Sequence, residues 1–242
     1  MKLHRLWPVA LVALLAAPAP LLSLAAPVAP FTEEFPTDPA QWTDGPPTGF
    51  ATWVLSGGPS GASDGYIAAP ADATALPENA SVVLFRGNST TSPSIHASGD
   101  KFAGDWLNGG INQFSAWVFN GSPYSVPLFA RFTQPSGGTG VAAFNGTTAA
   151  PNSWTQLSFV IAPSEINTTL FPEGPSSLYS SVFGNMGRIQ IGFNVPAAMA
   201  TAGGGVYTFG LDKVAVNTPE PTSLLLGLGA AAFVATRRRR TA

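Results

Sequence analysis

The sequence predicts an all-β protein, a two-sheet antiparallel sandwich of jelly-roll type, and two observations carry that prediction. The first is strict alternation of polar and apolar residues at 126–132, 155–161 and 188–195, which is typical of strands with one buried face. The second is the abundance of turn formers, 26 Gly and 23 Pro, which disfavours long helices. Many short strands separated by turns indicate a sandwich.

The individual strands follow from the same alternation. In 155–161, Leu157, Phe159 and Ile161 share one face, and in 188–195 the alternation has no break. One short helix is expected at 176–183, where Gly184 ends it. Further strands are expected at 51–55, 65–69, 81–87, 112–120, 140–145 and 205–216.

The first 25 residues are predicted to be a signal peptide with a signal helix. Lys2 and Arg5 form a short positive region, and an apolar stretch follows from 6 to 24. Ser23 and Ala25 are small residues at the two positions that signal peptidase reads, so we expect cleavage after Ala25. The alternative is an uncleaved membrane anchor. The chain is therefore expected to be exported.

The last 24 residues, 219–242, form a three-part tail. Two prolines in Pro219-Glu220-Pro221 favour an extended linker, and residues 222–236 are mostly apolar. This segment, expected to be a short hydrophobic helix, has fewer than the roughly 20 residues that usually span a bilayer. It can still hold a precursor in the inner membrane if the bilayer thins locally, and positive charge favours the cytoplasmic side. The positive cluster is Arg237, Arg238, Arg239 and Arg240.

These three parts, in this order at the C-terminal end, resemble the PEP-CTERM sorting tail of bacterial exosortase substrates. The resemblance implies that an exosortase-type membrane transpeptidase recognises Pro219, Glu220 and Pro221 and cleaves near them. It also implies a Gram-negative bacterium that makes exopolysaccharide, and a final location in the cell envelope, on the outer surface or in the extracellular matrix. The alternative is an ordinary C-terminal anchor.

The body between the two signals, residues 26–218, is acidic. Six of the 11 basic residues and one of the 13 acidic residues lie in the two ends, which leaves five against twelve and a net charge of −7. This charge argues against nucleic acid or anionic lipid as a ligand and is compatible with calcium and neutral glycans. Cysteine is absent, which excludes disulfides and thiol catalysis.

The body shows no catalytic motif. His96 is its one histidine, and the sequence has no nucleophile elbow, no His-Glu-x-x-His and no phosphate-binding loop. We therefore predict a non-enzymatic envelope or matrix protein that associates with exopolysaccharide. A secreted glycan hydrolase and a purely structural coat protein remain as alternatives.

A calcium site is suggested by three acidic residues. Asp212 interrupts an apolar final strand and needs a partner, and Glu33 is expected to open the first strand. Together with residues 63–67, they resemble jelly-roll carbohydrate-binding modules and laminin-type sandwiches. That resemblance implies a structural Ca²⁺ with Glu33, Asp64 and Asp212 as ligands. The alternative is surface acids and an Asp212 that is already satisfied.

A sugar-binding aromatic residue is predicted at Trp106. It lies in a glycine-rich loop, 104–110, where we expect an exposed ring that can cover the apolar face of a sugar. The alternative is packing as a lid, and for Trp117 and Trp154 the core is expected. Exposed aromatic rings with polar neighbours on the concave face of the sandwich would favour sugar binding, and a flat Ser/Thr face would favour a coat.

Overall fold

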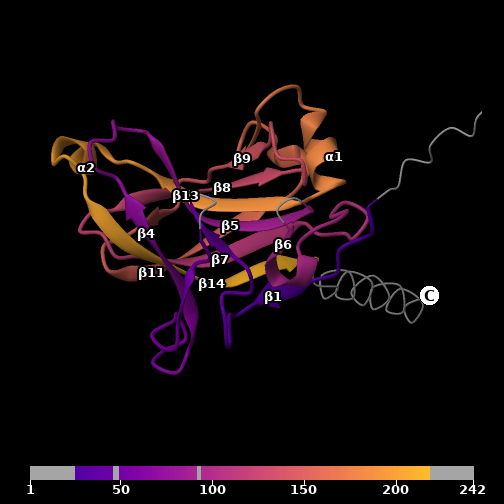
Figure 1. Ribbon diagram of the computed structural model, residues 1–242. Coiled ribbons are helices and arrows are strands. Elements are labelled where there is room, and N and C mark those ends of the chain that lie inside the picture. The colour runs from indigo at the N-terminus through magenta and orange to yellow at the C-terminus, as the bar shows by residue number, and fades with distance from the viewer. Residues whose placement is uncertain (1–24, 46–48, 92–93, 219–242) are drawn as a thin grey trace, which may run out of the picture.

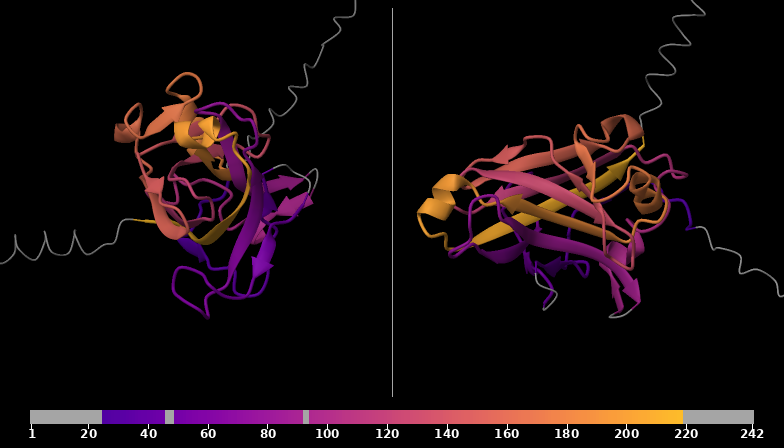
Figure 2. Two further views of the ribbon diagram at one scale, coloured as in Figure 1. Left: turned by 90° about the vertical axis from the view of Figure 1, so that its left-hand side faces the viewer. Right: turned by 90° about the horizontal axis from the view of Figure 1, so that it is seen from above.

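The computed structural model describes residues 25–45, 49–91 and 94–218. The predicted sorting tail, and the predicted signal peptide except for Ala25, lie outside these residues. The body consists of two antiparallel β-sheets packed against each other (Figures 1 and 2), so the predicted all-β sandwich is confirmed. In the part of the chain that the structure describes, no helix is long and apolar enough to cross a membrane.

The first sheet has β14 at its centre. β7 pairs with one edge of β14, while β4 and β1 share the other edge. Its strands are β1 (Phe31–Glu33), β3 (Thr52–Val54), β4 (Tyr66–Asp72), β7 (Gln113–Asn120), β11 (Ser153–Val160) and β14 (Val206–Asn217).

The second sheet has β8, β13 and β5 side by side at its centre. Short strands extend it at both edges and at the strand ends. Its strands are β2 (Thr43–Asp44), β5 (Ser81–Thr91), β6 (Ser94–His96), β8 (Val126–Thr133), β9 (Val141–Ala143), β10 (Thr148–Ala149), β12 (Leu170–Pro172) and β13 (Arg188–Asn194).

The connections between the sheets define the jelly roll. In chain order, β4, β7, β11 and β14 belong to the first sheet, and β5, β8, β9 and β13 belong to the second. The spatial orders are β4-β14-β7-β11 and β5-β13-β8-β9, which is the two-Greek-key arrangement of a jelly roll. Sequence neighbours such as β4 and β5 therefore lie in opposite sheets.

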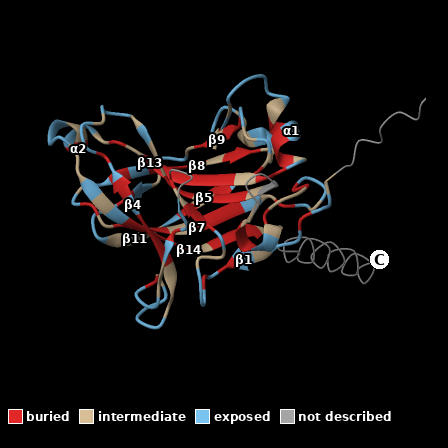
Figure 3. Ribbon diagram, in the orientation of Figure 1, coloured by how far each residue is buried: buried red, intermediate tan, exposed pale blue. Residues whose placement is uncertain are grey.

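The core lies between the sheets, where the buried segments gather (Figure 3). It is rich in phenylalanine. Phe193 of β13 stacks on Phe209 of β14 with ring centroids 4.9 Å apart, and Phe132 of β8 meets Phe114 of β7 edge to face at 5.2 Å. Both pairs join one sheet to the other. Each buried ring removes a large apolar area from water, which makes these pairs major contributors to stability.

The predicted helix at 176–183 is confirmed as α1 (Leu178–Phe183). A second short helix, α2 (Ala197–Thr201), and two 3₁₀ turns, η1 (Ala97–Asp100) and η2 (Pro163–Glu165), were not predicted. Glu33 ends β1 and does not open it, so that detail of the prediction is wrong.

Candidate functional site

The outer face of the second sheet carries the most distinctive group of side chains. Along β8, Leu128, Ala130 and Phe132 point into the core, so alternation turns Phe129 and Arg131 to the outside. The register of the sheet then places outward residues of neighbouring strands side by side. We call this surface the outer face.

A row of polar side chains crosses the outer face. Arg86 of β5 lies opposite Gln190 of β13, and Gln190 lies opposite Arg131 of β8. Arg131 donates to the Gln190 side-chain oxygen at 3.1 Å and to the carbonyl oxygen of Gly138 at 2.6 Å. The row is therefore partly locked by hydrogen bonds between side chains of different strands.

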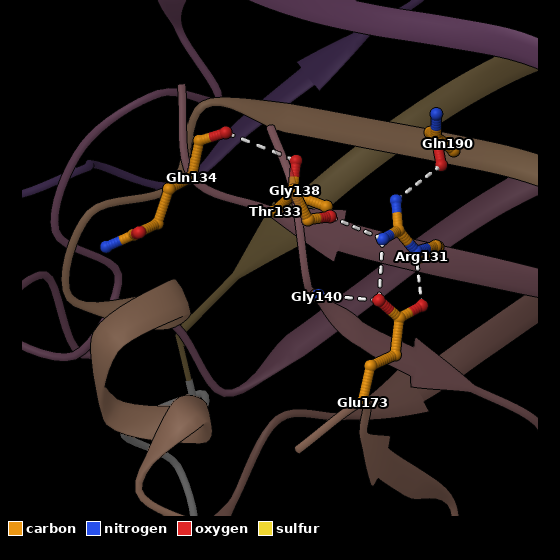
Figure 4. A network of polar contacts seen from close by, with 7 residues as sticks. All are labelled: Arg131, Thr133, Gln134, Gly138, Gly140, Glu173 and Gln190. Atoms are coloured by element: carbon orange, nitrogen blue, oxygen red, sulfur yellow. Dashed lines mark hydrogen bonds and ion pairs between the residues drawn. The ribbon is translucent and has the colours of Figure 1, made fainter. Parts of the chain in front are cut away.

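Glu173 fixes the guanidinium of Arg131 in a two-point ion pair (Figure 4). One carboxylate oxygen accepts from Nε, and the other accepts from Nη2 at 2.6 Å and from the backbone N–H of Gly140 at 2.7 Å. The hydrogen bond from Arg131 is the main reason why the pKa of Glu173 lies below its usual value. Paired contacts of this kind hold a planar guanidinium in one orientation.

Three aromatic rings lie beside the polar row. Phe144 contacts Phe129 at a centroid distance of 5.7 Å and Phe171 at 6.1 Å. Phe129 is buried, Phe144 is half-buried, and Phe171 is 38% exposed. Gly192 makes room for this cluster, because a Cβ there would lie 2.7 Å from the Phe129 ring. The outer face thus combines an exposed aromatic edge with polar neighbours.

Trp106 does not belong to this face, and its predicted exposure is wrong. The side chain is fully buried, and its indole N–H donates to the carbonyl oxygen of Phe102 at 2.8 Å. The ring packs against Phe132 and Phe183, with centroid distances of 5.6 and 5.7 Å. A ring enclosed in this way cannot offer a face to a sugar, so Trp106 is a core residue.

The predicted calcium ligands fall into two places. Asp212 lies at a bulge in β14, where its register with β7 shifts, and the side chain is fully buried. Asp64 lies near it, and the Lys213 ammonium is 3.8 Å from both Asp64 and Glu34. Glu33 lines a separate cleft and accepts the N–H of Phe35 at 3.1 Å. The structure therefore groups Glu34, and not Glu33, with the other two.

The electrostatics of Asp212 are unusual. Oδ1 accepts the backbone N–H of Lys213 at 2.7 Å, whereas Oδ2 is buried without a hydrogen-bond partner. Burial raises the pKa of Asp212 to about 7, and the charges of Asp64 and Glu34 act in the same direction. Among the residues that the structure describes, no group of three or more potential metal ligands is arranged around one point. The oxygen donors suit Ca²⁺, but Lys213 already neutralises part of the cluster.

His96 lies in the same cleft as Glu33, a depression of about 470 Å³. Its Nδ1 is 2.7 Å from the Asp100 carboxylate, and the Ser89 hydroxyl donates to that carboxylate at 2.6 Å. The hydroxyl therefore binds the acid. In a Ser-His-Asp arrangement the hydroxyl would contact the imidazole, as activation of a nucleophile requires.

Comparisons with known proteins give distant likenesses only. No family model and no curated protein matches the chain. Among solved structures it is similar to a family 11 carbohydrate-binding module from Clostridium thermocellum in complex with a β-1,3-1,4-mixed-linked tetrasaccharide, with a TM-score of 0.41, 12% identity and coverage of 80% of this chain and 98% of the module. It is also similar to the L4b domain of human laminin alpha-2, with a TM-score of 0.37, 10% identity and coverage of 70% and 97%. The strand order within the two sheets, and not these likenesses, defines the jelly-roll fold of the body.

The outer face was not predicted as a site, although its residues were visible in the sequence. Arg131, Arg188 and Gln190 occupy the polar positions of strands that alternation predicts. The sequence does not give the register between strands. β5 and β13 are about one hundred residues apart, and only the folded sheet places Arg86 opposite Gln190.

Proposed function

We propose that this chain is an exported, non-enzymatic protein of the cell envelope or extracellular matrix that binds exopolysaccharide through the outer face of its second sheet. The observation that carries the proposal is the combination of exposed and half-buried phenylalanine rings with a hydrogen-bonded polar row. Aromatic rings cover the apolar faces of sugars, and fixed polar groups select their hydroxyls.

The geometry of the outer face favours binding over a purely structural coat. A coat needs no oriented groups, whereas here Glu173 and Gln190 both hold Arg131 in place. Such preorganisation lowers the entropic cost of binding a flexible glycan. The side chain with the largest exposed aromatic area in this cluster is Phe171.

A polysaccharide retention assay tests the proposal. The full chain is applied to exopolysaccharide extracted from the producing cells, and Phe171→Ala is compared with Leu55→Ala, an exposed apolar residue of the loop after β3. We expect Phe171→Ala to weaken retention roughly threefold to tenfold, the range for one aromatic contact. Equal retention by both variants would refute binding at this face.

Export and tail processing belong to the same proposal. We infer signal peptidase cleavage after Ala25 and exosortase processing near Pro219-Glu220-Pro221, on the sequence features at the two ends. Intact-mass analysis of the envelope form should show that the leader and Arg237–Arg240 have been removed. Retention of the whole tail would contradict processing and leave anchoring in place.

Absence of catalysis is proposed because the sequence of the body has no nucleophile elbow, no His-Glu-x-x-His and no phosphate-binding loop. Release of reducing sugar from the bound polysaccharide tests it. Measurable release that is lost in His96→Ala would overturn this part of the proposal and favour the hydrolase alternative.

Calcium binding is a further part of the proposal, with Asp64 and Asp212, the two predicted ligands that lie near each other, contributing oxygen atoms. The unpartnered Oδ2 of Asp212 supports it, and the Lys213 ammonium would have to leave the cluster. Calorimetric titration of the full chain with Ca²⁺ tests it. If the titration gives no heat and Ca²⁺ causes no thermal shift, the calcium proposal is refuted.

A further inference from the structure

The positive charges of this acidic body are concentrated on the outer face. The body has five basic residues, and three of them, Arg86, Arg131 and Arg188, lie on the neighbouring strands β5, β8 and β13. The body as a whole carries twelve acidic residues, so this clustering is opposite in sign to its average charge. A local positive patch of this kind attracts anions even when the domain repels them on average.

The sheet register sets the spacing of the three arginines. Arg86 and Arg131 flank Gln190 on either side, and Arg188 lies two residues from Gln190 along β13. With strands about 4.8 Å apart and a rise of about 3.3 Å per residue, the Cα atoms of Arg86 and Arg131 are about 10 Å apart. Burial lowers the pKa of Arg86, and the charges of Arg188 and Arg131 lower it further, in keeping with this proximity.

Only one of these arginines is neutralised. Arg131 has Glu173, whereas Arg86 and Arg188 have no ion pair or hydrogen bond with any residue that the structure describes. The Nε atom of each is buried without a partner. A buried donor on a charged group raises the free energy of the protein when it has no hydrogen-bond partner. Binding of an anion to these two guanidinium groups would therefore be favourable.

A neutral acceptor, Asn88, and a cleft lie beside Arg188 and Arg86, respectively. Asn88 lies directly opposite Arg188, and its Oδ1 is also buried without a partner. Arg86 opens into a cleft of about 700 Å³ that runs along β5 toward β4. Asp44 and Asp72 line the same cleft, but neither forms an ion pair with Arg86. The cleft gives room for the sugar units on either side of a bound anionic group.

We propose that Arg86 and Arg188 recognise an oxyanion substituent, a carboxylate or a sulfate ester, on an acidic polysaccharide. This inference rests on the proposed glycan-binding function and names its ligand class. The forked donors of arginine match the paired oxygens of such groups, and they discriminate against the corresponding neutral sugar.

Isothermal titration of the full chain with four defined polymers tests the inference. Polygalacturonate is compared with its methyl-esterified form, and dextran sulfate with neutral dextran. We expect at least one acidic polymer to bind more tightly than its neutral counterpart, with an affinity that falls as salt rises. Preference within the first pair identifies a carboxylate, and preference within the second identifies a sulfate ester.

Variants connect the preference to the two arginines. Arg86→Gln and Arg188→Gln should each weaken acidic-polymer binding roughly tenfold or more, as expected for a lost charge-assisted hydrogen bond. Arg86→Lys should recover part of the loss because it restores charge without the fork. Lys101→Gln, at an exposed cation outside the outer face, is the matched control and should leave binding unchanged. Unchanged urea midpoints show that the glutamine variants remain folded.

The failures are distinguishable. Equal affinity for acidic and neutral polymers, or wild-type affinity in both glutamine variants, would overturn the recognition of an oxyanion. In that case retention on extracted polysaccharide that depends on Phe171 can still stand. If neither the preference for an acidic polymer nor the Phe171-dependent retention is observed, both this inference and the glycan-binding proposal are refuted.

Discussion

Replacing Asp212 by asparagine tests whether a buried carboxylate, one of whose oxygens has no hydrogen-bond partner, governs the pH dependence of stability. The side chain is fully buried, and its pKa of about 7 lies well above 3.8, the ordinary value for an aspartate side chain. A carboxyl group with a raised pKa in the folded state holds its proton longer there than in the unfolded chain. Stability is therefore lost as the pH rises from the unfolded value toward about 7, and the loss levels off above it.

The magnitude follows from the same two values. Each pH unit between them costs about 1.4 kcal/mol, so the full effect is about 4 kcal/mol, and about 2.5 kcal/mol of it falls between pH 5 and pH 8. Asparagine keeps an oxygen for the Lys213 N–H but adds a buried amide without a partner, which costs about 1–3 kcal/mol. The variant should therefore be less stable than wild type near pH 5 and should gain on it by about 2.5 kcal/mol toward pH 8.

Urea unfolding followed by tryptophan fluorescence measures this difference. Both proteins are unfolded at the two pH values in the presence of a chelator, and the change in unfolding free energy is compared. Asp72→Asn is the matched control, because Asp72 is fully exposed with a lowered pKa and should not contribute in this window. The same slope in wild type and Asp212→Asn would refute the argument from burial. Recovery of wild-type stability at pH 8 on adding Ca²⁺ would instead support the calcium site.

Trp106→Ala should lower the free energy of unfolding by about 3–5 kcal/mol in the same urea assay, because it empties a packed core position; a loss below 1 kcal/mol would contradict the buried placement. Glu173→Gln should remove an acid-sensitive contribution: the lowered pKa of Glu173 means that wild type loses this stability as pH falls through that value, by less than about 1 kcal/mol for a partly exposed pair. Acid titration of unfolding would show no difference if the pair were inert. Gly192→Ala should destabilise by about 1–3 kcal/mol in thermal unfolding, since its Cβ would lie 2.2 Å from the Val82 carbonyl oxygen. Gly49→Ala should be neutral, because among the described residues its Cβ would meet only the Asp44 carboxylate, at an ordinary contact distance of 3.8 Å. A similar effect of both substitutions would contradict the close approach at Gly192.

Alternation predicted the long strands and the sandwich, because a half-buried strand leaves a two-residue period over seven or more positions. It did not predict β2, β10 or β12, which have only two or three residues each and therefore show little or no alternation of their own. The position of β1 was misjudged by the same cause, which put Glu33 at the wrong end of the strand.

The candidate site was harder to predict, because it depends on long-range register and on local packing. A glycine-rich loop suggested an exposed Trp106, but the chain there folds beneath α1, so that the ring meets Phe183. The net charge suggested a surface that prefers neutral or cationic ligands, yet the sheet gathers Arg86, Arg131 and Arg188 on one face. The net charge of the body says nothing about how its charged residues are distributed over the surface.

The central place of β14 in the first sheet has a consequence for how the protein folds. This strand is the last of the body in chain order, yet it separates β7 from β4 and β1, and Figure 1 shows it running through the sheet. The first sheet therefore cannot be completed until residues 206–217 are available for strand pairing. The pairing of Phe31 with Val216 closes almost the entire body into one loop. Such long-range closure makes folding slow, because the chain must close a long loop before these strand contacts can form. A chain that ends before β14 would leave the edges of β4 and β7 without a pairing partner. We expect proteases to degrade such a truncated chain faster than the full chain.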